Sequence, residues 1–332
     1  MIKVNRVTKI YQSHIRQNNM FKDIFFRTFK EHEAVSNLTF EVDQGEFVGF
    51  IGPNGAGKTT TLKMLAGILT PTSGSIAVWG GNPFDKKHAF LKNISFIMGQ
   101  RNQLIWDLPA EESFILQKAV YAIDDHQYKK TRDTLTAILR CEHLVTKPVK
   151  TLSLGERMKM EFIASLLHRP QLVFLDEPTI GLDIFSQEAI REFIKEYQRE
   201  YRATVILTSH YLEDVRRLAK RLLVIDKGHL VYDGTLKDMI AHYSGEKQIK
   251  ITLERPVPVD KLQLVGPVQS ALFPQVVYSV KRTDIPEVIK KIADLLPFTD
   301  LTVEDPNIEE VIKSFFANHK LHKDSNPQIN NK

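Results

Sequence analysis

The residues with the clearest chemical potential form a glycine-rich stretch, Gly52–Thr59, with the sequence GPNGAGKT. It follows EFVGFI, which resembles a buried strand, and precedes TTTLKMLAG, which is typical of a helix. Glycines let successive backbone amides point at phosphate oxygens, and the positive end of the next helix attracts the same anion. Such a turn can be purely structural, but Lys58 and Thr59 stand where the phosphate-binding pattern requires them. We therefore predict a nucleotide phosphate site, with Lys58 reaching the β- and γ-phosphates and Thr59 binding Mg²⁺.

Two adjacent carboxylates, Asp176 and Glu177, follow a second apolar run, QLVFLDEP. Ligands of parallel sheets bind at the carboxyl ends of the strands, where this pair would lie. Asp176 suits the Mg²⁺ shell, and Glu177 can orient and deprotonate an attacking water. Acid pairs at strand ends are often only solvated turns or helix caps. The phosphate loop earlier in the chain favours the catalytic interpretation.

A third stretch, SLGE at Ser153–Glu156, supports two interpretations. As a capping box, the Ser153 hydroxyl accepts from the Glu156 amide, and the Glu156 carboxylate accepts from the Ser153 amide. Gly155 would then lie in the first turn of a helix, at a cost of up to about 1 kcal/mol relative to alanine. A glycine at that place indicates that another group comes close to the backbone.

The elements that must position these residues follow an alternating pattern. The apolar runs EFVGFI, QLVFLD, ATVILTS and RLLVID are separated by helical segments, which predicts an α/β domain with a largely parallel sheet. After HYSGEK the short runs QIKITL, VVYSVK and DLTVED alternate with the helical stretches IPEVIKKIADLL and NIEEVIKSFFANH, which predicts a small α+β domain. We place the two domains at residues 1–240 and 246–317, followed by a polar tail at 318–332.

Composition narrows the class of protein. A chain of 332 residues is long for one domain and indicates two. No apolar run approaches the roughly 18 residues that span a bilayer, and the N-terminal residues lack the apolar core of a secretory signal, so we expect a cytoplasmic protein. The single cysteine, Cys141, excludes an intramolecular disulfide and a cysteine-based metal cluster. A net charge of +5 is too mild to require nucleic acid, although it would tolerate an anionic membrane surface.

Five motifs occur in a familiar order: GPNGAGKTT, the glutamine in IMGQRNQL, LSLGE, VFLDEPTIGLD and LTSH. Over roughly residues 1–235 the chain resembles the nucleotide-binding domains of ABC transporters. The resemblance implies a P-loop NTPase cassette with a RecA-like core, an antiparallel β subdomain and a helical subdomain at about residues 100–165. The loops and the closing DLTVEDPNIEEVIKSFF look most like bacterial exporter-type subunits of the daunorubicin and multidrug resistance branch. Importer subunits also carry C-terminal domains, so import stays an alternative.

The resemblance also implies roles for single residues. Tyr11 looks like the aromatic that stacks on adenine, with an ordinary core tyrosine as the alternative. Gln100 matches the glutamine that contacts Mg²⁺ and signals to the membrane partner, and Gln103 is the less favoured candidate. His210 resembles the switch histidine at the γ-phosphate, although a lone histidine is more often only a satisfied polar residue. Asp183 matches the loop that crosses to the other subunit.

Taken together, the implied cofactors are ATP and Mg²⁺. The implied ATP-binding residues are Tyr11, Gly52, Pro53, Asn54, Gly55, Ala56, Gly57, Lys58, Thr59, Thr60 and Gln100. The implied catalytic residues are Glu177, His210 and Lys58, and the implied Mg²⁺ ligands are Thr59, Gln100 and Asp176.

The family signature explains what could approach Gly155. In this family the signature closes over the γ-phosphate of the nucleotide on a second domain, and here it consists of Leu152, Ser153, Leu154, Gly155 and Glu156. Leu154 replaces a glycine and Glu156 replaces a glutamine. The added negative charge would weaken closure unless Arg157 or the capping box turns Glu156 away. Because one chain carries one phosphate loop and one signature, we expect a head-to-tail homodimer, or a heterodimer with a similar ATPase, around two ATP molecules.

Residues 12–33 form an insert between Tyr11 and Ala34. Placed on a helix, it is amphipathic: Phe21, Ile24, Phe25 and Phe29 fall near one face, and Lys22, Arg27 and Lys30 lie elsewhere. Such a helix could lie at the membrane surface, against a transporter subunit, or on its own domain.

The expected partners are separate transmembrane permease subunits, which would hold the chain peripherally on the inner face of the cell membrane. Trp106, in RNQLIWDLPAEESF, is a candidate anchor for that contact or a packed residue of the helical subdomain. We expect no nucleic acid partner. The rival interpretations are a soluble ABC ATPase acting on ribosomes or nucleic acid, which usually has two cassettes or a coiled coil, and a P-loop kinase, which would not need LSLGE or His210.

Overall fold

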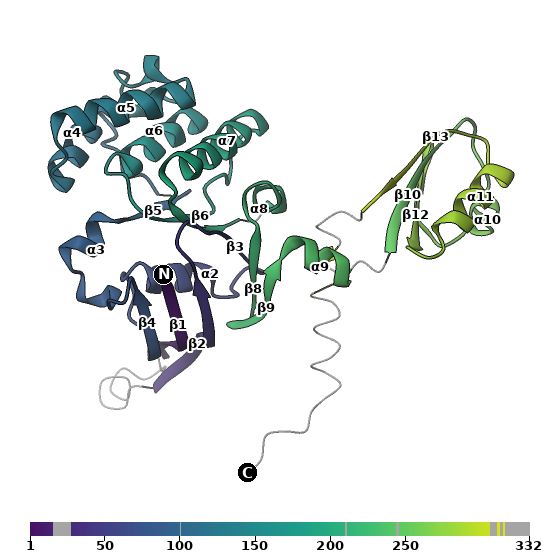
Figure 1. The fold of residues 1–332 in the computed structure, drawn as a ribbon, viewed down its shortest axis with the longest axis horizontal. Helices are drawn as coiled ribbons and strands as arrows, with labels where there is room; N and C mark the ends of the chain where they lie inside the picture. Colours follow the sequence, from purple (N-terminus) through teal and green to yellow (C-terminus); the bar gives the residue numbers. More distant parts are fainter. Residues whose placement is uncertain are drawn as a thin grey trace, which may run out of the picture. The chain divides into compact units, whose positions relative to one another are not determined.

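The structure is a computed structural model, and it describes residues 1–15, 28–99, 101–209, 211–243 and 246–305, with positions 311, 312 and 315. The chain divides into two compact units, Met1–Gly234 and Thr235–Lys332 (Figure 1). The domain limits drawn from the sequence stay predictions.

In the first unit, the described residues form a sheet of six strands in the order β5-β6-β7-β3-β8-β9. The pairs β5–β6, β6–β7, β7–β3 and β3–β8 are parallel. β3, β6 and β7 are buried at every residue, as expected for parallel strands covered on both faces. The strands are β3 Phe47–Ile51, β5 Ile94–Met98, β6 Leu172–Asp176, β7 Thr204–Thr208, β8 Arg221–Asp226 and β9 His229–Thr235. The predicted α/β core is confirmed.

Helices and short 3-10 turns surround this sheet. The α-helices are α2 Lys58–Leu65, α3 His88–Lys92, α4 Ala110–Tyr121, α5 Asp125–Leu139, α6 Leu154–Leu166, α7 Ile184–Tyr201 and α8 Leu212–Leu218. The 3-10 turns are η1 Pro83–Asp85, η2 Glu142–Leu144 and η3 Val149–Thr151. In Figure 1, α4, α5 and α6 gather as one group of helices beyond β5 and β6. Cys141, just after α5, is fully buried, and burial raises its pKa to about 12.

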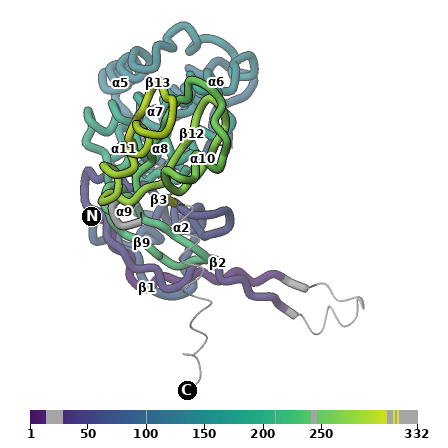
Figure 2. The backbone as a smooth tube through the Cα atoms, turned by 90° about the vertical axis from the view of Figure 1, so that its right-hand side faces the viewer, coloured from purple at the N-terminus to yellow at the C-terminus, as the bar shows by residue number. Residues whose placement is uncertain are grey.

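A three-stranded sheet, in the order β2-β1-β4, covers the other side of the first unit. Its strands are β1 Ile2–Ile15, β2 Thr28–Val42 and β4 Ser73–Val78, and β1 pairs antiparallel with both neighbours. The β1–β2 pairing runs from Ile2 opposite Val42 to Ile15 opposite Thr28. Figure 2 shows the outer ends of these two strands projecting together from the rest of the unit, and we call residues 11–15 and 28–33 the arm.

The arm corrects the helical interpretation of the insert. Phe29 lies in a strand, opposite His14, so a helical face through Phe29 is wrong, and Lys30 lies in the same strand, opposite Ser13. The segment continues a hydrogen-bonded ladder that β1 and β2 have already begun, and this pairing outweighs a helical spacing of aromatic residues. The other members of the proposed face, Phe21, Ile24 and Phe25, lie outside the described residues, as do the basic residues Lys22 and Arg27.

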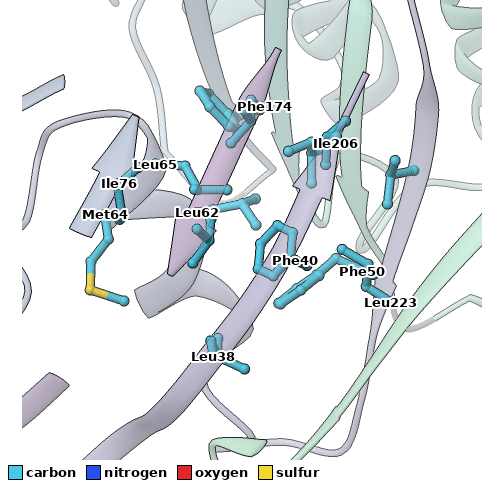
Figure 3. Packing of buried hydrophobic residues seen from close by; sticks show 14 of the residues in the cluster. Leu38, Phe40, Phe50, Leu62, Met64, Leu65, Ile76, Phe174, Ile206 and Leu223 are labelled. Atoms are coloured by element: carbon cyan, nitrogen blue, oxygen red, sulfur yellow. The ribbon is translucent and has the colours of Figure 1, made fainter. Parts of the chain in front are cut away.

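A hydrophobic core joins the two sheets of the first unit through α2 (Figure 3). Phe40 of β2 packs against Phe50 of β3 with ring centroids 6.1 Å apart. Both ends of the phosphate loop are anchored in this core, since β3 precedes the loop and α2 follows it. The side chains labelled in Figure 3 are Leu38, Phe40, Phe50, Leu62, Met64, Leu65, Ile76, Phe174, Ile206 and Leu223.

The second unit has a core of its own. Its described strands form a four-stranded antiparallel sheet in the order β11-β12-β10-β13, and alternate residues such as Ile249 and Ile251 face a cluster with Tyr278 and Ile292. This confirms the predicted α+β fold. The elements are α9 Leu236–Tyr243, β10 Glu246–Leu253, α10 Val259–Gln263, β11 Val268–Leu272, β12 Gln275–Lys281, α11 Ile285–Leu295 and β13 Phe298–Glu304. Across both units, every described helix is too short or too polar to cross a bilayer.

Candidate active site

The phosphate loop is folded tightly around Lys58. Its ammonium donates to the carbonyl oxygens of Gly52 at 2.8 Å and Pro53 at 3.1 Å. Gly57, which begins α2, has φ +103°, and a Cβ there would lie 2.4 Å from the carbonyl oxygen of Ala34. Only glycine tolerates both the backbone angle and the close approach of β2. The loop therefore holds a lysine whose ammonium is ready to exchange carbonyl partners for phosphate oxygens.

Lys58 is also electrostatically poised. Burial lowers the pKa of its ammonium, while the nearby carboxylates of Glu177 and Asp176 act in the opposite direction. A desolvated ammonium attracts an added anion more strongly than a hydrated one, because less water must be displaced to reach it, while the two carboxylates offset part of its charge.

Asp176 lies beside the start of α2. Its Oδ1 accepts from the hydroxyl of Thr59 at 3.0 Å and from the hydroxyl of Thr208 at 2.7 Å. Carboxylate and hydroxyl oxygens are the hard ligands that Mg²⁺ prefers, so Thr59 and Asp176 fit the ion that the sequence implied. Thr208 was missed from the sequence, although it ends β7 in register with Asp176 on β6.

Glu177 is held in an unusual backbone conformation. Its φ is +54°, and its amide donates to the carbonyl oxygen of Thr208 at 3.0 Å and the hydroxyl at 3.1 Å. A left-handed conformation in a non-glycine residue costs roughly 1–3 kcal/mol and is concentrated at functional sites. A Cβ on Gly99, after β5, would lie 2.1 Å from the Glu177 carbonyl oxygen, so the acid is fixed from two sides.

One pocket of about 280 Å³ brings most of the predicted ATP-binding residues together. Its lining is Tyr11, His32, Ala34, Asn54, Gly55, Ala56, Gly57, Lys58, Thr59, Thr60 and Glu177. Tyr11 is 39% exposed at its rim, directly opposite His32 on the neighbouring strand, with the Lys9 ammonium 5.4 Å from its ring centroid. A half-exposed ring is available for stacking, unlike a core tyrosine. His32 was missed because it is 21 positions from Tyr11 in the sequence, and only the strand pairing places the two residues opposite each other.

The signature residues form a complete capping box. The Glu156 amide donates to the Ser153 hydroxyl at 3.3 Å, and the Ser153 amide donates to the Glu156 carboxylate at 2.9 Å. These hydrogen bonds lower the pKa of Glu156. Arg157 takes no part, since its guanidinium lies 5.4 Å from the ring centroid of Trp106. The capping box therefore turns the extra charge back toward the start of α6.

The close approach to Gly155 comes from within the chain. A Cβ on Gly155 would lie 2.2 Å from the Ser186 hydroxyl oxygen. Asp183 caps α7 by accepting from the amide of Ser186 at 2.9 Å and from its hydroxyl at 2.6 Å. Next to this cap, Ile184 and Phe185 are 78% and 86% exposed. The signature helix and the Asp183 loop thus form one packed surface, and no residue of Leu152–Glu156 belongs to the described lining of the phosphate-loop pocket.

Gln100 and His210 lie outside the described residues. Gln103 is the less favoured alternative to Gln100. Its backbone amide donates to the carboxylate of Glu161 at 2.9 Å, and its side-chain amide donates to the carbonyl oxygen of Phe96 at 3.1 Å. Burial raises the pKa of Glu161. Gln103 is thus anchored to the protein itself, through an acid that sequence reasoning missed.

Comparison with known proteins identifies the family. A family model described as "ABC transporter" matches residues 35–180, and one described as "EvrA-like ABC transporter, C-terminal domain" matches residues 245–304. The linearmycin resistance ATP-binding protein LnrL of Bacillus subtilis is 29% identical over 86% of this chain and 94% of its own. The Nod factor export ATP-binding protein I of Rhizobium etli is 30% identical over 74% of this chain and 77% of its own. The chain belongs to the ABC transporter family.

A solved ATP-binding subunit of an ABC transporter shares the fold of this family member, with a TM-score of 0.61 and 24% identity over 80% of this chain and 98% of its own. The predicted cassette fold is confirmed. The chain is an ATP-binding subunit of an ABC transporter and an ATPase of the ABC type, which works with membrane subunits.

Proposed function

We propose that two cassettes close head to tail around two ATP molecules and hydrolyse them at composite sites, most simply as a homodimer. The observation that carries this proposal is the separation within one chain. Tyr11, the phosphate loop and Glu177 line one pocket, while Ser153 and Gly155 are presented by a different helix start. The N-terminus of a helix attracts phosphate. Since Ser153 and Gly155 do not line the pocket of their own chain, the phosphate in this proposal comes from the nucleotide of a second cassette.

The proposed chemistry uses the residues of the pocket. Tyr11 stacks on the base, and the Lys58 ammonium exchanges the carbonyl oxygens of its own loop for phosphate oxygens. Glu177 orients the attacking water and accepts its proton. Mg²⁺, held by Thr59, Asp176 and Gln100, would neutralise the charge on the β- and γ-phosphates. His210 contacts the γ-phosphate in this proposal.

We further propose that the membrane subunits dock on the face formed by the segment before α4 and by α4 itself. A groove of about 480 Å³ there is lined in part by Leu91, Phe96, Gln103 and Val120. The same two segments also expose apolar side chains: Ile105, Trp106, Leu108, Ile115 and Leu116. Exposed apolar side chains that gather on one surface are typical of a protein contact. The chain would then sit on the inner face of the membrane, and the names of relatives linked to export and resistance support outward transport.

The substitution Glu177→Gln tests the composite site. We expect ATP binding to persist, steady-state hydrolysis to fall by about 100-fold or more, and an ATP-dependent dimer to accumulate in Mg²⁺, because the water is no longer activated. Multi-angle light scattering with and without ATP measures the dimer. Glu192→Gln makes the same chemical change on the exposed face of α7 and should leave turnover unchanged.

A Glu177→Gln protein that hydrolyses ATP at the normal rate, or stays monomeric at saturating ATP, would contradict the proposed site. The same variant, purified from its native cells in mild detergent with ATP, should retain proteins with several membrane spans. Reconstituting those proteins with the wild-type chain in vesicles would then show whether transport runs outward or inward.

A further inference from the structure

A buried cluster of four polar side chains lies in the first unit, outside the nucleotide pocket. At its centre is the carboxylate of Asp214 on α8. Oδ2 of Asp214 accepts from the hydroxyls of Thr179 at 2.5 Å and Ser209 at 2.6 Å, and Oδ1 accepts from Nε of Arg191 at 2.6 Å. All four residues are buried, and Asp214 is 0% exposed. Short bonds to a desolvated carboxylate are among the strongest in a protein.

Each donor of this cluster comes from a different segment. Thr179 is two residues after Glu177, and Ser209 directly precedes His210 in the sequence. The hydroxyl of Ser209 also accepts from the amide of Tyr211 at 2.9 Å, so it ties down the residues on both sides of position 210. One carboxylate thereby connects the segment that carries the proposed general base with the segment that carries the proposed γ-phosphate contact.

Arg191 completes the cluster as the counter-ion. Besides Asp214, its guanidinium donates to the side chains of Gln187 at 2.9 Å and Glu188 at 3.2 Å, both on α7. A buried charge must be paired, and Arg191 is the cation that pairs with the Asp214 carboxylate, so removing Arg191 would take away the counter-ion of that carboxylate. Arg191 therefore holds Oδ1 of the carboxylate, and this orientation leaves Oδ2 to accept from the two hydroxyls.

We propose that Asp214 is a positioning residue for ATP hydrolysis, which fixes the segments of Glu177 and His210 relative to each other through Thr179 and Ser209. The inference rests on the proposed roles of Glu177 and His210. Asp214 is not among the described residues that line the pocket, and in this proposal it does not touch the nucleotide. Its effect is on the alignment of the catalytic groups, where a displacement of about 1 Å can cost about 100-fold in rate.

The test removes the two hydroxyls singly and together. Because Asp214→Asn would remove the buried negative charge beside Arg191 and threaten folding, we choose Thr179→Val and Ser209→Ala. Each is expected to lower kcat by about tenfold or more while the KM for ATP stays within about twofold, since binding does not require the alignment. Thr136→Val, which removes a buried hydroxyl that donates to the Asp133 carbonyl oxygen on α5, is the matched control and should leave kcat unchanged.

The double variant distinguishes positioning from local packing. If both hydroxyls act through the same carboxylate, removing either one already loses the alignment. The kcat of the double variant Thr179→Val with Ser209→Ala should therefore be within about twofold of the kcat of the less active single variant. Independent losses that multiply, or folded single variants with kcat within twofold of wild type, would overturn the proposal. Glu177→Gln is assayed in parallel. If that variant still turns over, the site assignment fails instead, whatever the hydroxyl variants do.

Discussion

At the scale of single residues, we expect one histidine in the helical part of the first unit, His168, to make the stability depend on pH. His168 follows α6, and its Nε2–H donates to the carbonyl oxygen of Ile94 at 3.0 Å. Its ring stacks on Tyr121 with centroids 3.7 Å apart. Burial lowers the pKa of His168 to about 4, while the bond to Ile94 acts in the opposite direction. The folded protein therefore carries this imidazole neutral at pH values where an unfolded chain would already be protonated.

From this we predict acid sensitivity with a definite sign. Between pH 6.5 and 4 the unfolded state binds a proton that the folded state does not, so the free energy of unfolding should fall by up to about 3 kcal/mol from this residue and then level off. Above pH 6.5 the contribution is complete. Urea denaturation across this range measures it, with His168→Phe as the variant that keeps an aromatic ring against Tyr121. Equal pH slopes in the two proteins would contradict the prediction.

At the scale of elements, the contact between α6 and α7 explains the glycine of the signature. Gly155→Ala should add helix propensity, yet its Cβ would lie 2.2 Å from the Ser186 hydroxyl. We expect the clash to win and to destabilise the protein by about 1–3 kcal/mol. In the double variant Gly155→Ala with Ser186→Gly the clash is gone, and alanine should instead stabilise by up to about 1 kcal/mol relative to Ser186→Gly alone. A double-mutant cycle by urea denaturation measures the coupling, and additive effects would rule out the contact.

The elements also show how far the sequence could lead. The phosphate loop and the strands around it were predictable, because β3, β6 and β7 are continuous apolar runs with chemistry at their carboxyl ends. The partner of Gly155 was not, since Ser186 lies 31 positions away and only packing brings it close. Thr208, Asp214 and Glu161 escaped notice for the same reason: their roles depend on tertiary contacts, not on spacing. Phe29 was misjudged because its spacing from the preceding aromatic residues fits a helical period, and the strand pairing that overrides this spacing is not visible in the sequence.

At the scale of the whole molecule, the two units have separate cores. Phe40 and Phe50 belong to one and Ile251 and Tyr278 to the other. Separate cores need not unfold together, so two-state behaviour is expected for each unit and not for the chain.

We predict two transitions in differential scanning calorimetry. ATP with Mg²⁺, added to the Glu177→Gln variant at about 100 times its Kd, should stabilise the unit of residues 1–234 alone, by about 3 kcal/mol. Ile251→Val should lower only the other transition, by about 1 kcal/mol, and so assigns it. A single transition that moves as a whole with ATP would show that the two units unfold as one.

The buried Cys141 has a practical consequence for following closure in solution. A thiol that is 0% exposed and has a pKa near 12 holds almost no thiolate at neutral pH, so it should resist maleimide reagents while the protein is folded. Since it is the chain's only cysteine, the native protein is already a background for site-specific labelling. A cysteine introduced at the highly exposed Phe185 would carry a fluorophore next to the Asp183 loop. Energy transfer between two labelled chains could then report, on each addition of nucleotide, how far apart the two loops stand.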